Sequence, residues 1–536
     1  MATMALQNLE ELHLVMLATS AILFCAWQLW DRYRLAREDY TNKYRRNIPL
    51  IAHDGLVSRW LPALYYLLRG PEILLRNYTA GQPFAVTTPG ACYIHFSSES
   101  HVKELIEAPS EKLSLHALSK DMFKPEYTMN GLEVQDTTSG NGNQHTRVFR
   151  VILTSYLPML RHPLAHTIAN AFSQELSVGK IRGDKVQVSA FAMAKRVMAA
   201  ANAFVFFGET LSADPQFLDA ALAYPEDLFF TAEILRLAPS LIHPILAPVL
   251  MRNHKASKTL VKYLSPVVEQ RLRQARGNRS SDRNQQSKPI DCIQFFVDVN
   301  SHKDRWTAEK IVQVLLGTWF AAVHQPALTL VYALQDICDN VDYAELLREE
   351  IHTGGYSVGM DDPTSSLKSS LDDAPLLDAF LKESARMHPS DAISVRRKVL
   401  KPYTFADGTQ LLPGDVACVP SQAMMRDEKH YSSSTTFSPS RFMTPKKNIK
   451  SGYGEGFETA SRFTSTDLRY PFWGLGRHSC PGRFYASLVL KLVIAHVLTH
   501  YEIEPTAQSG SRTWSYRSSI LPSTGFLFRI RGEVKR

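Results

Sequence analysis

The residues that decide the fold of this chain lie near its C-terminus and read FWGLGRHSCPG, from Phe472 to Gly482. Gly474 and Gly476 allow the backbone to turn tightly and to approach a flat ligand closely. Cys480 stands at the start of an apolar stretch, from about Pro481 to Tyr501, that predicts a long helix. At a helix start, backbone N–H groups and the helix dipole lower the pKa of a thiol and favour the thiolate. We therefore expect a cysteine thiolate that donates electrons to a metal.

A buried structural cysteine is the alternative interpretation when this stretch is taken alone. The six cysteines of the chain are scattered, without CxxC or zinc-type spacing. This pattern argues against a disulfide framework and against a zinc module, and it fits a reducing compartment. In such a compartment, at most one cysteine needs a special role.

Two helices are predicted upstream of the cysteine. The first begins near the N-cap residue Thr307 and runs to about Asp339, a length of roughly 50 Å at about 1.5 Å per residue. It is apolar almost all round, so it should cross the interior of the domain. The second runs from Leu376 to Met387 and carries Glu383 and Arg386 on one face, where the carboxylate and the guanidinium can pair.

Short strands are predicted after the second helix. One is expected over Ile393–Val399, and a hairpin-like stretch over Tyr403–Val419, with turns at Asp407-Gly408 and Pro413-Gly414.

Three motifs in this order resemble the cytochrome P450 superfamily. They are Glu383-Ser-Ala-Arg386, the FSPSRF segment from Phe437 to Phe442, and the stretch from Phe472 to Gly482. The last resembles the haem-binding loop, and its CPGRFYA continuation is similar to fungal members of secondary metabolism. The resemblance implies a mainly α fold with a small β-rich region, a haem b cofactor, and Cys480 as the axial ligand of the haem iron.

The resemblance also implies roles for other residues. The expected cofactor-binding residues are Trp473 (where the family usually has Phe), Gly474, Gly476, His478, Gly482, Arg397 and Arg150. The expected structural support of the haem loop is the triad Glu383, Arg386 and Arg441.

The centre of the long helix departs from the family pattern. Where an acid–alcohol pair usually delivers protons to oxygen, the chain carries His324 and Gln325, followed by Pro326. Because Pro326 has no N–H, the carbonyl of Ala322 loses its helical partner, and a kink with an open groove is expected. We expect His324 to relay protons and Gln325 to order a water. A kink needed for packing alone is the alternative.

The N-terminus predicts a membrane anchor. Residues 12–30 form an apolar run close to the length of about 20 residues that spans a bilayer. The basic residues that follow predict a cytoplasmic catalytic domain. The expected organisation is a lumenal segment 1–11, a transmembrane anchor 12–30, a basic linker 31–50 and a catalytic domain 51–536. A cleaved signal peptide is disfavoured, because a basic flank before the run and a small-residue cleavage site are missing.

The net charge of +8 is compatible with an anionic membrane or an acidic protein partner. Nucleic acid is not expected, because no dense Lys/Arg run with interleaved aromatic residues occurs. The resemblance implies a monooxygenase of the endoplasmic reticulum membrane that uses O2 and NADPH through a separate cytochrome P450 reductase, with cytochrome b5 as a further candidate partner. The expected substrate is a lipophilic terpenoid or meroterpenoid. A reductase-independent isomerase or dehydratase and a non-enzymatic haem sensor or electron carrier are the alternatives.

Overall fold

The computed structural model describes residues 48–51, 60–132, 144–277, 288–300, 306–354, 371–445, 457–459, 461–506, 513–523 and 525–530. The predicted segments 1–11 and 12–30, and nearly all of the linker 31–50, lie outside the described residues.

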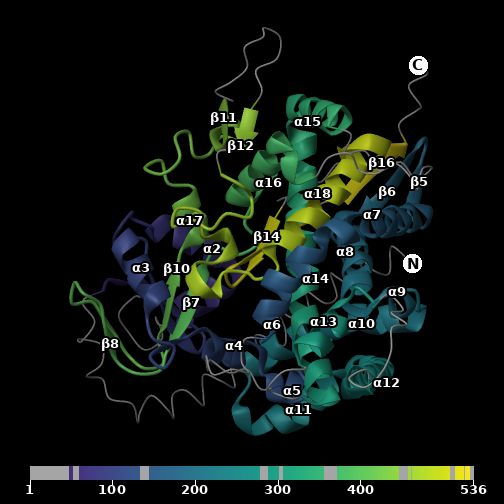
Figure 1. The fold of residues 1–536 in the computed structure, drawn as a ribbon. Helices are drawn as coiled ribbons and strands as arrows, with labels where there is room; N and C mark the ends of the chain where they lie inside the picture. The colour runs from purple at the N-terminus through teal and green to yellow at the C-terminus, as the bar shows by residue number, and fades with distance from the viewer. Residues whose placement is uncertain are drawn as a thin grey trace.

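Helices make up most of the described chain (Figure 1). They are α2 (Trp60–Asn77), α3 (Glu99–Glu107), α4 (Leu115–Phe123), α5 (Pro125–Thr128), α6 (Gln144–Arg147), the π-helix η2 (Val148–Leu153), α7 (Thr154–Ser177), α8 (Ala190–Phe207), α9 (Glu209–Ser212), α10 (Pro215–Leu237), α11 (His243–Leu250), α12 (Lys255–Gly277), α13 (Cys292–Val299), α14 (Ala308–Asp339), α15 (Val341–Thr353), α16 (Pro375–Met387), α17 (Ser421–Met425) and α18 (Arg483–His500).

The strands are short and form several small sheets, one beside α3 and another beside α7 (Figure 1). They are β1 (Leu50–Ile51), β2 (Phe84–Thr88), β3 (Ala91–His95), β4 (Leu113–Ser114), β5 (Lys180–Arg182), β6 (Lys185–Ser189), β7 (Ser394–Val399), β8 (Tyr403–Thr404), β9 (Gln410–Leu411), β10 (Val416–Val419), β11 (Met443–Pro445), β12 (Phe457–Thr459), β13 (Tyr501–Pro505), β14 (Thr513–Tyr516), β15 (Ser519–Pro522) and β16 (Gly525–Ile530). The predicted mainly α fold with a small β-rich region is confirmed.

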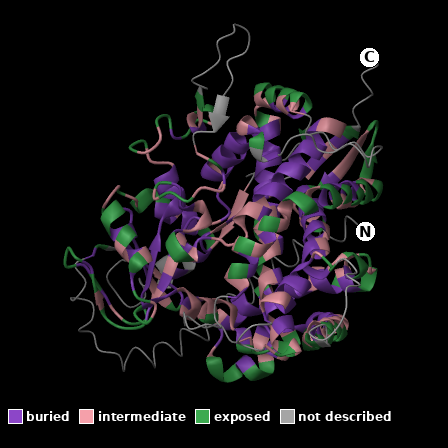
Figure 2. Cartoon of the chain, viewed as in Figure 1, coloured by how far each residue is buried: buried purple, intermediate pink, exposed green. Residues whose placement is uncertain are grey.

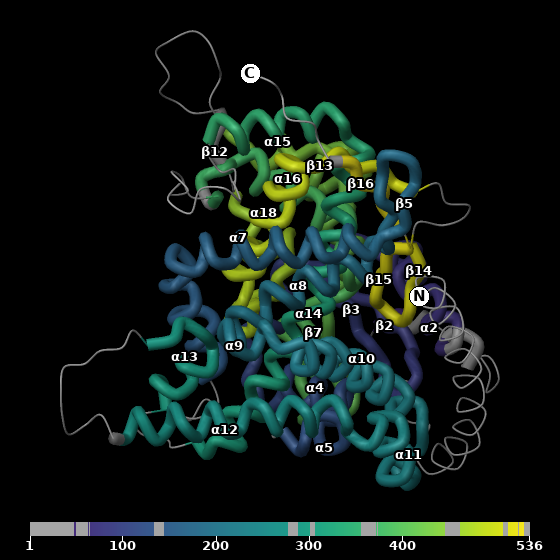
Figure 3. The backbone as a smooth tube through the Cα atoms, turned by 90° about the vertical axis from the view of Figure 1, so that its right-hand side faces the viewer, coloured from purple at the N-terminus to yellow at the C-terminus, as the bar shows by residue number. Residues whose placement is uncertain are grey.

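The long helix α14 crosses the centre of the domain, as its apolar composition predicts. Its N-cap is Thr307, whose hydroxyl accepts a hydrogen bond from the N–H of Lys310 at 3.2 Å. The buried helices α14, α16 and α18 form the middle of the core, and α8 lies along α14 (Figures 2 and 3). Helices α8 and α14 are long and apolar enough to cross a membrane, but most of each is buried within the domain, as in the core helices of a soluble protein.

Helix α16 begins at Pro375, one residue before its predicted start. Proline suits the first helical position, because its missing N–H would have no partner there. The carboxylate of Glu350 in α15 accepts hydrogen bonds from the next two N–H groups, those of Leu376 and Leu377, at 2.8 and 2.9 Å. This contact fixes the start of the helix that carries Glu383 and Arg386.

The predicted hairpin over Tyr403–Val419 is only partly correct. Strands β8 and β9 pair with each other, but β10 leaves them and lies between β3 and β7 in the sheet β1-β2-β3-β10-β7-β4. All four residues of β10 are buried. A strand buried on both faces is most stable in the interior of a sheet, where both of its edges are paired.

The C-terminal helix also begins later than predicted. Gly482 is the N-cap of α18, and its carbonyl accepts from the N–H of Ala486 at 2.9 Å. Pro481 lies in the turn before the helix, so Cys480 precedes the helix instead of opening it.

Candidate active site around Cys480

A cavity of about 580 Å³ lies between α14 and the loop that carries Cys480. The lining residues come from α14, from the cysteine loop and α18, and from α6, α8 and the segment 389–394. The lining residues used below are His145, Asn202, Ala321, Ala322, Gln325, Pro326, Thr329, Ser390, Asp391, Ser394, Ser421, Trp473, His478, Cys480, Gly482 and Tyr485.

The cysteine loop is closed by one backbone hydrogen bond, from the N–H of Cys480 to the carbonyl of Trp473 at 2.7 Å. Gly474 and Gly476 have φ angles of 70° and 62°, which side chains rarely tolerate. A Cβ on Gly476 would also approach the side chain of Ile106 in α3 to 3.3 Å. The two glycines therefore make possible both the turn and the close approach of α3.

The pKa of the Cys480 thiol is raised, which corrects the prediction that the helix start lowers it. Burial has the largest effect and raises the pKa, because a thiolate is poorly solvated there. The N–H groups of Gly482 and Arg483 and the guanidinium groups of Arg483 and Arg150 act in the opposite direction. A coordinated metal deprotonates a thiol outright, so the thiolate is expected once the metal is bound.

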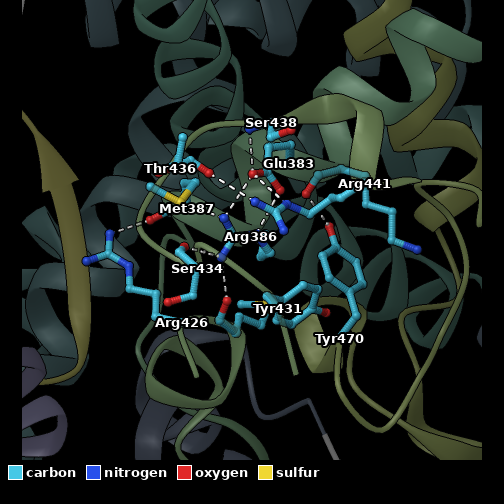
Figure 4. Close-up of polar contacts among 12 residues, drawn as sticks. Glu383, Arg386, Met387, Arg426, Tyr431, Ser434, Thr436, Ser438, Arg441 and Tyr470 are labelled. Carbon is cyan, nitrogen blue, oxygen red and sulfur yellow. Dashed lines mark hydrogen bonds and ion pairs between the residues drawn. The ribbon is translucent and has the colours of Figure 1, made fainter. Parts of the chain in front are cut away.

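A buried triad supports the segment that leads to the cysteine loop (Figure 4). Arg386 donates to both carboxylate oxygens of Glu383, at 2.7 and 2.9 Å, and Arg441 donates to the same carboxylate at 3.0 Å. Glu383 and Arg386 are fully buried. Arg386 also donates to the carbonyls of Met425 and Ser434, at 2.6 and 2.7 Å. The triad thus ties α16 to the chain between residues 425 and 441.

Aromatic residues continue this support into the loop. Tyr470 donates to the carbonyl of Lys382 in α16 at 3.3 Å, and the indole N–H of Trp473 donates to the carbonyl of Phe463 at 2.7 Å. This bond fixes the indole of Trp473, which lines the cavity.

Of the three basic residues that were predicted to bind the cofactor, His478 lines the cavity, whereas neither Arg150 nor Arg397 is among its lining residues. His478 lines the cavity, and its ring lies 5.9 Å from that of His116 between centroids. Arg150 instead donates to the carbonyl of Ser479 at 2.9 Å and supports the loop. Arg397 is buried in β7 and donates to the carbonyl of Arg396 at 2.8 Å. Contact of Arg150 and Arg397 with the cofactor stays a prediction.

His145 is a cavity residue that sequence reasoning missed. Burial and the neighbouring His116 lower its pKa to about 4, so its imidazole is neutral at physiological pH. His145 and Arg150 are five residues apart, and the π-helix η2 begins between them. A π-helical turn accommodates one more residue than an α-helical turn.

The structure separates His324 from Gln325. Gln325 lines the cavity, and its amide oxygen accepts a hydrogen bond from the hydroxyl of Ser390. His324 faces α8, with its ring 6.3 Å from that of Phe191. Burial, reinforced by Lys195, lowers its pKa to about 4. Its predicted role as a proton relay is not supported by this position, because His324 does not line the cavity.

The cavity fits a haem. Cys480 lines it, and a Cβ on Gly482, two residues later, would meet no atom within 4 Å. Within the described ranges, no group of three or more His, Cys, Asp or Glu side chains is placed to hold a metal ion directly. A lone thiol beside a wide, mostly apolar cavity suits a metal whose other ligands come from a flat organic ring.

The known proteins that are similar to this chain are cytochrome P450 proteins. The family model described as Cytochrome P450 matches residues 134–527. The cytochrome P450 monooxygenase AtmP of Aspergillus flavus is 30% identical over 444 residues, which cover 81% of this chain and 79% of that protein. The cytochrome P450 monooxygenase olcJ of Penicillium canescens is 29% identical over 440 residues, 81% of this chain and 78% of that protein. Cytochrome P450 monooxygenase 151 of Postia placenta is 26% identical over 521 residues, 96% of this chain and 97% of that protein.

The family match spans most of the chain, and it includes the loop in which Cys480 faces a cavity suited to a flat ring. Haem b is accordingly the cofactor, and the enzyme class is that of the cytochrome P450 monooxygenases. We conclude that this chain belongs to the cytochrome P450 family.

Proposed function

We propose that this enzyme uses O2 and electrons from NADPH, delivered by a separate reductase, to oxidise a lipophilic small molecule. The observation that carries the proposal is that Cys480 and Gln325 line one and the same cavity. A thiolate-ligated haem supplies the activation of dioxygen, because the thiolate donates electron density that favours O–O cleavage. The protein's contribution is to hold that thiolate, exclude bulk water and place polar groups beside the oxygen site.

Gln325 is the polar group of α14 that we propose to act at the oxygen site. Its Oε1 accepts from Ser390, so its Nε2 group remains to donate a hydrogen bond into the cavity. An amide does not titrate at physiological pH, so Gln325 orders a water and the proton itself comes from solvent. This role replaces the acid–alcohol pair that the family usually carries.

Replacing Gln325 with leucine tests this role. We expect product formation to fall by about 100-fold, the low end of what positioned proton transfer contributes, while NADPH is still consumed. The matched control is His324→Leu, one residue earlier but outside the cavity, which should leave product per NADPH unchanged. The measurement is the ratio of product to NADPH consumed. Equal losses in the two variants would show that the cavity-facing amide is not what matters.

The shape and lining of the cavity support a lipophilic substrate with a few oxygen functions. Most of the wall is apolar, and a few hydroxyl and carboxylate side chains line it, those of Ser390, Asp391, Ser394 and Ser421. We propose a terpenoid or meroterpenoid intermediate of fungal secondary metabolism, because such molecules combine a large apolar skeleton with isolated hydroxyl or carbonyl groups.

An exposed apolar stripe supports attachment of the domain to a membrane. Leu241, Ile245 and Val249 are 81%, 76% and 69% exposed, and their spacing of four places them along one face of α11 and the turn before it. Exposed apolar stripes of this kind mark membrane or protein contacts. Together with the predicted anchor at residues 12–30, the stripe supports our proposal of an endoplasmic reticulum membrane protein with a cytoplasmic catalytic domain.

Basic residues near the cysteine loop support docking of an acidic electron donor. Arg477 is exposed, and Arg483 lies on α18 directly after the loop. We propose NADPH-cytochrome P450 reductase as the partner at this face, with cytochrome b5 as a second donor.

Reconstitution tests the proposed function. The full chain in membranes, supplied with candidate terpenoids, should form product only when NADPH and reductase are both present. Turnover without reductase or NADPH would favour an isomerase or dehydratase instead, the alternative that the missing acid–alcohol pair suggests. The control is the same membrane preparation without the chain, which reports oxidation by the reductase alone.

A further inference from the structure

The side chain of Asn202 joins three helices at the edge of the cavity. Asn202 lies on α8 and is 2% exposed. Its Nδ2 donates to the carbonyl oxygen of Ala322 in α14 at 2.8 Å. Its Oδ1 accepts from the hydroxyl of Tyr485 in α18, also at 2.8 Å. The buried amide of Asn202 thus donates to α14 and accepts from α18.

The partner on α14 is the carbonyl that a proline leaves without its helical donor. In an α-helix, the carbonyl of Ala322 would accept from the N–H of the residue four positions later, which is Pro326. Helix α14 nevertheless runs through Pro326 as one element. A carbonyl that is shielded from water is unfavourable without a donor, and the amide of Asn202 donates to this partly buried carbonyl in place of the missing N–H.

The partner on α18 connects this contact to the cysteine side of the cavity. Tyr485 lies five residues after Cys480, and burial raises the pKa of its phenol well above the ordinary value. The phenol therefore keeps its proton and donates to Asn202. Both Ala322 and Tyr485 line the cavity, as does Asn202 itself. The two hydrogen bonds of Asn202 therefore connect α14, which carries Gln325, to α18, which follows Cys480.

We propose that Asn202 is a positioning residue that replaces the hydrogen-bond donor missing at Pro326 and sets the spacing between the α14 and α18 walls of the haem cavity. The inference rests on haem occupying this cavity, and it does not depend on the proposed substrate or reductase. Without Asn202, the carbonyl of Ala322 loses its side-chain donor, and we expect a water to take that place at the cavity wall.

A double-mutant cycle between Asn202 and Pro326 tests the proposal. The full-length, haem-loaded chain is compared with Asn202→Leu, Pro326→Ala and the double variant. Leucine is similar in size to asparagine but cannot donate, whereas alanine at position 326 restores the N–H that the carbonyl of Ala322 needs. We expect Asn202→Leu to lower the thermal unfolding midpoint by about 2–5 °C and to shift the substrate-free ferric haem absorbance toward the water-ligated form. In the Pro326→Ala background, at least half of both effects should disappear.

A control on the same helix separates this coupling from a general loss of packing. Asn340 donates from its Nδ2 to the α14 carbonyl of Asp336 at 2.8 Å, far from Pro326 in the sequence. Asn340→Leu should therefore lower the unfolding midpoint by the same amount whether position 326 is proline or alanine. Tyr485→Phe removes one of the two bonds of Asn202 and should shift the haem absorbance by less than Asn202→Leu.

Two outcomes would overturn the inference. One is an Asn202→Leu variant with the unfolding midpoint and spectrum of the wild type. The other is an effect of Asn202→Leu that is equally large with and without Pro326. If Asn202→Leu fails to fold, the smaller Asn202→Ala serves in its place, because alanine also removes the donor to the Ala322 carbonyl and adds no bulk. These readouts need no substrate and no NADPH, so a failed reconstitution of turnover would leave the result of the cycle intact.

Discussion

Replacing Cys480 with serine should remove the strongly red-shifted absorption band of the reduced, carbon monoxide-bound haem. A serine hydroxyl is too weak an acid to supply the anionic ligand that a thiolate provides, so the iron loses its electron-donating partner. Loss of an outer-shell partner of a metal ligand already costs about 10- to 100-fold in metal affinity or activity. We therefore expect substrate oxidation by Cys480→Ser to fall by at least about 100-fold.

The matched control for this variant is Cys338→Ser. Cys338 lies near the end of α14 and does not line the cavity, and its Sγ donates to the carbonyl of Ile503 at 3.7 Å. This variant should keep both the red-shifted band and the activity. A Cys480→Ser protein that retains the band, or a well-folded wild type that lacks it, would mean that another residue ligates the iron.

Neutralising Glu383 should have the second largest effect, this time on stability. The carboxylate accepts from both Arg386 and Arg441 and from the backbone N–H of Ser438 at 2.9 Å. Glu383→Gln keeps the size of the side chain, but it removes the charge and replaces one acceptor oxygen with an NH2 donor that faces arginine donors. Breaking a buried ion pair from one side costs about 3–5 kcal/mol, because the remaining charge stays buried without compensation.

Glu72 offers a comparison with similar spacing at the surface. Its carboxylate lies 3.4 Å from the guanidinium of Arg69, three residues earlier, and its side chain is 34% exposed. Glu72→Gln should lower the free energy of unfolding by at most about 1 kcal/mol, because solvent screens exposed ion pairs. The measurement is the urea midpoint of each full-length variant, followed by haem absorbance. If the two variants lose equal stability, the Glu383 triad does not support the fold as its burial implies.

Local patterns were sufficient for much of the fold. The N-cap at Thr307 and the mostly apolar stretch up to Asp339 predict α14 almost to the residue, because both are properties of the segment itself. Glu383 and Arg386 pair as predicted, because residues three apart on a helix are neighbours in any tertiary context. The position of Cys480 at the cavity likewise follows from a loop whose glycines and cysteine lie close together in sequence.

Other features depend on which distant segments come together. The pKa of Cys480 is raised rather than lowered, because burial by the whole domain outweighs the local N–H groups. Strand β10 joins a central sheet instead of a hairpin, and His324 faces α8 while its neighbour Gln325 faces the cavity.

The clearest example is the carbonyl of Ala322. Its missing partner can be read from Pro326 four residues later, because helix geometry is local. Its actual partner, Asn202, lies 120 residues away on another helix. No periodicity or motif links two such positions, since the hydrogen bond between them exists only after α8 and α14 have packed together.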